Sequence, residues 1–89
     1  MVKVLLFGEL ADLAGTSEVF LSERRVMDVV MALIDLYGKG FEDSILGGDQ
    51  DTRAIILVNN APVRHGVFEK ELADGDTVSL MPMRGGDVL

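Results

Sequence analysis

The chain has 89 residues, of which 8 are lysine or arginine and 15 are aspartate or glutamate, and its formal net charge is −7. This length predicts one domain with a small core. An acidic chain repels phosphate backbones, which argues against nucleic-acid binding and favours docking on basic partners. The sequence contains no cysteine, which excludes disulfides and fits a cytoplasmic protein. The apolar run Val4–Phe7 is too short to span a membrane.

The first half of the chain predicts two strands and one helix. Met1–Gly8 has apolar side chains on both faces at a period of two, which predicts a central strand. Glu9–Ser17 is interpreted as a turn-rich connection and Glu18–Leu21 as a second short strand. The clearest helix is Val26–Tyr37, whose apolar residues recur at spacings of three and four. Gly38 follows it, at the position where a left-handed residue ends many helices.

The second half supplies the remaining strands. Lys39–Arg53 is rich in glycine and acidic residues and is interpreted as a surface excursion with one helical turn at Phe41–Leu46. The strands expected after it are a buried aliphatic strand, a short edge strand and a last strand, at Ala54–Val58, Pro62–Arg64 and Thr77–Met81. Tight turns are expected at Asn59–Asn60 and Asp74–Asp76.

This order of elements predicts an α+β domain, with a mixed sheet of four to five strands and one main helix on one face. The first strand pairs best with the last, which places both ends of the chain in the middle strands. That arrangement is the β-grasp, or ubiquitin-like, fold. The opposite face of the sheet is expected to stay largely open.

A search for catalytic residues finds little. His65 is the only histidine, and a lone histidine in a loop is most often a surface residue. No cluster of histidines and carboxylates has the spacing of a metal site. Four carboxylates surround a predicted turn and are interpreted as a solvated rim, with a patch for a basic partner as the alternative: Glu69, Glu71, Asp74 and Asp76. We therefore expect no catalytic residue, no metal and no bound cofactor.

An apolar patch is expected on the open face of the sheet. If Val78 and Leu80 face the core, Met81 faces the open side together with Leu5 and Phe7 of the neighbouring strand. Such a patch is typical of a partner site, and the alternative is scattered apolar surface without a function.

The end of the chain is the most informative segment. It reads Met-Pro-Met-Arg-Gly-Gly-Asp-Val-Leu over residues 81–89. Pro82 ends the strand because proline cannot donate a hydrogen bond to the ladder. Gly85 and Gly86 follow directly and lack side chains, so they could thread a narrow tunnel in a partner enzyme. The alternative is a flexible tail without a function.

Taken together, these segments resemble the MoaD/ThiS family of ubiquitin-like sulfur carriers, and the small subunit of molybdopterin synthase in particular. The resemblance covers essentially the whole chain. It rests on the opening VKVLLFGEL, the helix, the Pro-then-Gly-Gly ending and three shorter segments, LAGTSE at Leu13–Glu18, VNN at Val58–Asn60 and DGD at Asp74–Asp76.

The resemblance implies that an E1-like adenylating enzyme uses ATP to activate the carboxylate of a terminal glycine. Sulfur then replaces the adenylate and leaves a thiocarboxylate. Gly86 would carry the reactive carboxylate, and Gly85, which has no side chain, would be the narrow residue before it. Molybdopterin formation with a large synthase subunit is the leading expectation, with thiamine, cysteine or transfer-RNA sulfur transfer as alternatives. The residues expected to contact partners are Leu5, Phe7, Met81, Pro82, Met83 and Arg84.

Two other classes stay open. Some archaeal members of the family are joined to lysines as protein modifiers, so conjugation through Gly86 is the second hypothesis. The third is a binding module whose tail is never processed. No feature of the sequence favours a self-contained enzyme, because no catalytic constellation is present.

Gly86 is not the last residue, since Asp87, Val88 and Leu89 follow it. Their side chains would not fit a tunnel shaped for glycine. We therefore expect a carrier domain at residues 1–86 and a C-terminal extension at residues 87–89. By resemblance to related carriers, a JAMM-type metalloprotease would cut between Gly86 and Asp87 before activation.

Overall fold

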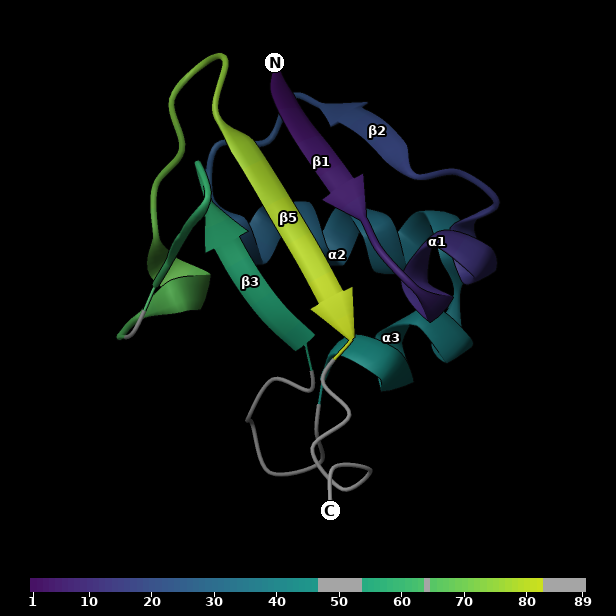
Figure 1. Cartoon of the computed structure of the whole chain (residues 1–89). Helices are drawn as coiled ribbons and strands as arrows, with labels where there is room; N and C mark the ends of the chain where they lie inside the picture. Colours follow the sequence, from purple (N-terminus) through teal and green to yellow (C-terminus); the bar gives the residue numbers. More distant parts are fainter. Residues whose placement is uncertain (47–53, 64, 83–89) are drawn as a thin grey trace.

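The computed structural model describes residues 1–46, 54–63 and 65–82. Its elements are, in chain order, β1 (Val2–Leu6), α1 (Glu9–Ala14), β2 (Glu18–Leu21), α2 (Val26–Tyr37), α3 (Lys39–Ile45), β3 (Ala54–Val58), β4 (Ala61–Pro62), the short 3-10 helix η1 (Val67–Glu69) and β5 (Thr77–Pro82). The strands form one five-stranded sheet in the order β2-β1-β5-β3-β4. Figure 1 shows β5 between β1 and β3, with α2 crossing behind the sheet.

The two central strands come from opposite ends of the sequence. β1 and β5 run parallel, with Val4 opposite Val78 and Leu6 opposite Leu80. β2 pairs with β1 and β3 pairs with β5, both antiparallel. The predicted α+β class, the pairing of the first strand with the last and the β-grasp fold are therefore confirmed.

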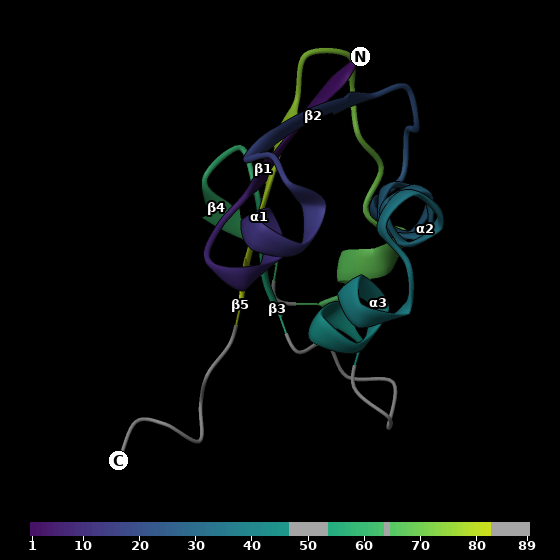
Figure 2. The same cartoon turned by 90° about the vertical axis from the view of Figure 1, so that its right-hand side faces the viewer.

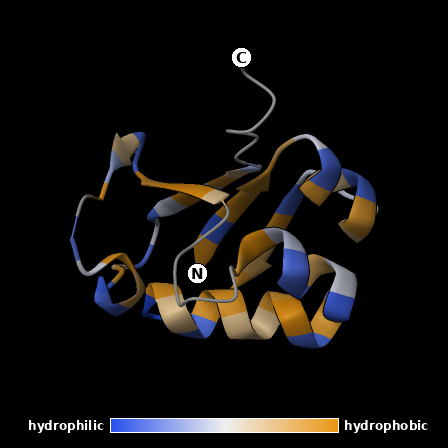
Figure 3. Cartoon of the chain, turned by 90° about the horizontal axis from the view of Figure 1, so that it is seen from below, coloured by the Kyte–Doolittle hydropathy of each residue, from blue (hydrophilic) through white to orange (hydrophobic). Residues whose placement is uncertain are grey.

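The core lies between the sheet and the helices. β1 alternates buried and half-buried residues, as expected for a strand with one face on the core. The buried residues of α2 form the predicted stripe at spacings of three and four: Val26, Val29, Val30 and Leu33. Phe41 of α3 is fully buried, and its ring centroid lies 5.3 Å from that of Tyr37. Figure 2 shows α2 and α3 on the same side of the sheet, and in Figure 3 α2 and the sheet form two layers.

Glu9–Ala14 is a helix, so the prediction of a turn-rich connection was wrong there. Gly8 precedes α1, and its carbonyl oxygen accepts hydrogen bonds from the amides of Ala11 at 3.1 Å and Asp12 at 3.2 Å. A six-residue helix is too short to be stable alone. Leu10, which is fully buried, anchors α1 to the core, and this tertiary contact has no counterpart in the local pattern.

Gly38 lies between two consecutive helices. Its φ of 92° is positive as predicted, but its ψ of −168° is extended and not left-handed helical. The reason is that Gly38 serves both neighbours: its amide donates to Ile34 at 2.8 Å, and its carbonyl accepts from Glu42 at 3.1 Å. α3 is also longer than the single turn predicted, and residues 47–53 of the predicted excursion lie outside the described residues.

The strand bounds need three small corrections. β3 has the predicted bounds, but it is not buried along its whole length as predicted, because Ile55 is 42% exposed. β4 spans Ala61–Pro62 and not Pro62–Arg64, and residue 64 lies outside the described residues. β5 includes Pro82, which lies opposite Ala54. The predicted turn between β3 and β4 is confirmed, since Asn59 and Asn60 have φ values of 53° and 68°.

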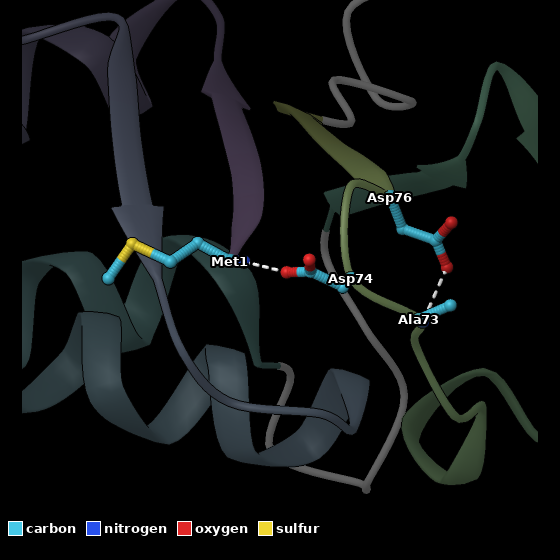
Figure 4. Close-up of polar contacts among 4 residues, drawn as sticks. All are labelled: Met1, Ala73, Asp74 and Asp76. Carbon is cyan, nitrogen blue, oxygen red and sulfur yellow. Dashed lines mark hydrogen bonds and ion pairs between the residues drawn. The ribbon is translucent and has the colours of Figure 1, made fainter.

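The predicted turn at Asp74–Asp76 joins several segments (Figure 4). The N-terminal ammonium of Met1 pairs with Asp74, and this holds the pKa of that carboxyl below its usual value. The Asp76 carboxylate accepts hydrogen bonds from the Ala73 amide at 2.8 Å and from Asn59 Nδ2 at 3.0 Å. These two bonds, the Ala73 bond first, lower the pKa of Asp76. The turn thus connects β5 to the β3–β4 hairpin.

Replacing Asp76 with asparagine is expected to flatten the acid end of the stability profile. Since the pKa of Asp76 is lower in the folded protein, its contribution is present above the unfolded value of 3.8 and is lost as the pH falls below it. Urea unfolding from pH 6 to about pH 2.5 should therefore show a steeper loss for the wild type than for Asp76→Asn. Asn59→Ala, which removes one donor, should be intermediate. Identical pH slopes for all three proteins would contradict this role.

Candidate functional site

The face of the sheet opposite α2 carries apolar side chains from three adjacent strands. The register places Leu5 of β1 opposite Ser79 of β5, and Ser79 opposite Leu57 of β3. One step further along, Met81 lies opposite Ile55. Residues that are directly opposite one another point to the same face of a sheet. These two rows therefore lie together on the side of the sheet opposite α2 and α3, which none of the described helices covers (Figure 2).

Phe7 completes the second row. Its amide donates a hydrogen bond to the carbonyl of Leu80 at 3.1 Å, which continues the parallel ladder one residue beyond β1. The continued register places Phe7 beside Met81. We define the open-face patch as the five apolar residues of these rows: Leu5, Phe7, Ile55, Leu57 and Met81. Phe7 and Ile55 are the most exposed of them, at 43% and 42%.

The predicted shared face of Leu5, Phe7 and Met81 is confirmed by this register. Ile55 and Leu57 were missed, because the aliphatic run Ala54–Val58 was interpreted as a buried strand. The signal that could have found them is the period of two: β3 pairs with β5, so every second residue of β3 must share the face of Met81. That these residues bind a partner stays a prediction.

Charge is distributed unevenly around the patch. On the open face, Lys3 and Glu18 form an ion pair at 3.5 Å. α2 and α3 carry the exposed acids Asp28, Asp35 and Asp43, and Lys39 of α3 is paired with Asp43 at 3.1 Å. The hydrogen bond from Lys39 to Asp43 raises the pKa of Lys39. An apolar partner surface therefore fits the open face better than the acidic helical face.

The patch ends where β5 ends. Pro82 is the last residue of β5, half-buried, directly after Met81. Three sets of predicted residues lie outside the described residues: the partner residues Met83 and Arg84, the glycines Gly85 and Gly86 expected to react, and the expected cleavage site between Gly86 and Asp87. The described part of the site is therefore the open-face patch together with Pro82, after which the C-terminal tail begins.

The other singled-out residues are ordinary surface groups. His65 is exposed, as predicted, and lines an open hollow of about 540 Å³ beside Lys70 and Asp76. Glu71 forms an ion pair with Arg25, with 4.0 Å between its carboxylate Oε2 and the guanidinium Nη2. Within residues 1–46, 54–63 and 65–82, no group of three or more histidine or carboxylate side chains could hold a metal ion. In the same ranges, no helix is long and apolar enough to cross a membrane.

The β-grasp fold, with an apolar patch on its open face and Gly-Gly in the segment after its last strand, defines the class of ubiquitin-like carrier proteins. The model of the ThiS family matches residues 4–86, so the chain belongs to this family of ubiquitin-like sulfur carriers and modifiers. The match ends at Gly86 and leaves residues 87–89 outside it.

Solved structures agree with this assignment. The chain is 33% identical to small archaeal modifier protein 1 from Methanosarcina acetivorans, with 96% of this chain and 94% of that chain covered and a TM-score of 0.81. It is 32% identical to a Pyrococcus furiosus protein described as a putative molybdopterin converting factor, subunit 1, with 92% and 95% covered and a TM-score of 0.71. For CysO from Mycobacterium tuberculosis the identity is 26%, the coverage 93% and 99%, and the TM-score 0.76. No curated protein sequence matches significantly.

Proposed function

We propose that this protein carries sulfur as a thiocarboxylate on Gly86 and takes part in molybdopterin formation. The observation that carries the proposal is the family match, which ends at Gly86. Gly86 is the fourth residue after the end of β5 at Pro82. The protein itself would be non-catalytic and would bind no cofactor.

The position of the open-face patch supports this function. Four residues span at most about 14 Å when fully extended. When a partner binds Phe7, Met81 and Ile55, Gly86 therefore lies within about 14 Å of Pro82. Binding energy from the patch would hold the reacting carboxylate in place, which is what a carrier contributes to its partner's chemistry.

The chemistry needs no acid or base from the carrier. A carboxylate is a poor electrophile, so an E1-like enzyme would join it to ATP as an acyl-adenylate and release pyrophosphate. A sulfur nucleophile would then attack the carbonyl carbon, and AMP would leave. After transfer of the sulfur atom, water would regenerate the carboxylate at Gly86.

The three residues after Gly86 must be removed for this chemistry. Hydrolysis of the peptide bond between Gly86 and Asp87 would create the carboxylate that the activating enzyme needs. We propose that residues 1–86 form the carrier domain, and that a JAMM-type metalloprotease removes residues 87–89. The end of the family match at Gly86 supports this division.

Intact-mass measurement tests the proposal. Protein isolated from its own host should end at Gly86, and incubation with the host's E1-like enzyme, ATP and a sulfur donor should add one sulfur-for-oxygen exchange. A matched variant with Gly86 deleted should not gain sulfur. If a chain prepared to end at Gly86 stays unmodified with the active enzyme, the sulfur-carrier function is wrong. A host protein that ends only at Leu89 would contradict the processing step.

Similarity to molybdopterin converting factor, subunit 1, supports the molybdopterin pathway, in which a large synthase subunit would be the acceptor. A second function, conjugation to lysines, is supported by the similarity to small archaeal modifier protein 1. The same host samples discriminate the two. Other proteins whose lysines carry the C-terminal remnant of this chain would favour the modifier, and transfer of sulfur to a molybdopterin precursor would favour the carrier.

A further inference from the structure

Gly8 and Pro82 are in close contact where β1 and β5 end. Gly8 has a φ of 59° and a ψ of −134°. A methyl group added to its Cα would lie 2.9 Å from Cγ and 3.3 Å from Cδ of Pro82. Carbon atoms that are not bonded do not approach to less than 3.0 Å without displacement. Only glycine at position 8 therefore allows the proline ring to lie where it does.

Neither partner in this contact can move aside easily. The carbonyl of Gly8 accepts hydrogen bonds from Ala11 and Asp12 in the first turn of α1. The ring of Pro82 closes on its own backbone nitrogen, so it cannot rotate away as a long side chain would. Pro82 also lies opposite Ala54 in the β3–β5 ladder. A side chain at position 8 would therefore displace the backbone at Pro82.

We propose that Gly8 is a positioning residue for the start of the C-terminal tail, because the space it leaves lets Pro82, from which the tail starts, lie where it does. The inference rests on the proposed function of Gly86. A side chain at position 8 that displaces Pro82 would move the start of the tail relative to the open-face patch, which the partner would bind. A displacement of even about 1 Å at a reacting group can cost about a hundredfold in rate.

The test compares adenylation of four forms that end at Gly86: wild type, Gly8→Ala, Pro82→Ala and the double variant. Since every described element lies within residues 1–82, these forms retain all of them. Pro82→Ala removes Cγ and Cδ, the two atoms that a methyl group on Gly8 would meet. Gly38→Ala is the matched control, because Gly38 also combines a positive φ with an extended ψ, but an added methyl group there meets no atom within 4 Å.

Pyrophosphate release with the host's E1-like enzyme gives kcat/KM, and thermal unfolding checks that each form is folded. Gly8→Ala should lower kcat/KM by about tenfold or more, and Gly38→Ala by less than about threefold. In the Pro82→Ala background, the Gly8→Ala change should cost less than about threefold, because the clash is gone. An effect of backbone strain alone would be equal in both backgrounds, and that result would overturn the inference.

Two further outcomes keep the test decisive. Pro82→Ala alone cannot clash, and it should lower kcat/KM by about threefold or more because the ring contact is lost. An unchanged kcat/KM for this variant would overturn the inference even if Gly8→Ala fails to fold. If the wild-type form ending at Gly86 is not adenylated, the proposed function fails. If the wild type is adenylated and the variants have the same kcat/KM as the wild type, only the proposed role of Gly8 is contradicted.

Discussion

Placing a carboxylate at position 81 is expected to weaken docking strongly while the domain stays folded. Met81 lies on the open face between Phe7 and Ile55, in the row closest to the tail. In the free protein, a half-buried aspartate at this position can stay hydrated. In a complex it would be a buried, unpaired charge in an apolar interface. Residues at the centre of an interface often contribute about 2 kcal/mol or more, which is about thirtyfold in affinity.

Titration calorimetry with the two proposed partners, an E1-like enzyme and a large synthase subunit, measures this loss. Met31→Asp is the matched control, because Met31 is a methionine on α2 that is 49% exposed and lies on the helical side. Met81→Asp should weaken binding by about thirtyfold or more, and Met31→Asp by less than about threefold. An equal effect of the two substitutions would argue against the open face as the docking surface.

Replacing Phe41 with alanine is expected to have the largest effect on stability. Phe41 is fully buried in α3, beneath the end of α2, and its ring packs against that of Tyr37. Truncation of a buried phenylalanine costs about 3–5 kcal/mol. A domain of this size has a total stability of only about 5–13 kcal/mol. The variant should therefore keep only part of the wild-type free energy of unfolding.

Urea unfolding followed by circular dichroism gives the comparison. Phe20→Ala is the control, because Phe20 lies on the edge strand β2 and is 54% exposed. It should cost about 1 kcal/mol or less. If Phe41→Ala were as stable as Phe20→Ala, α3 would not be part of the cooperative core.

Sequence patterns predicted the elements whose signal is local. The stripe of α2 gave its bounds at Val26–Tyr37, and the aliphatic run of β3 gave Ala54–Val58. The elements that were missed depend on contacts between distant segments. α1 exists because Leu10 enters the core, and the ψ of Gly38 follows from its place between two helices.

The candidate site shows the same division. Alternation along β1 and β5 predicted that Leu5, Phe7 and Met81 share one face. The period of two along β3 groups Ile55 with Leu57, but only the register between β3 and β5 shows that this pair shares the face of Met81. The contact of Gly8 with Pro82 joins residues near opposite ends of the chain. A single sequence offers no signal for such a contact, because no local pattern links residues so far apart in the chain.

The central place of β5 has a consequence for the synthesis of this protein. β5 separates β1 from β3, so a nascent chain that lacks it leaves both of those strands with an unpaired edge. Lys3 of β1 can pair with Thr77 of β5 only after almost all of the domain has been translated. Such long-range pairing is slow and cannot begin early. The sheet can therefore be completed only once β5 has been synthesised. A translation product that stops before β5 would expose two unpaired strand edges, which favour aggregation and recognition by chaperones and proteases.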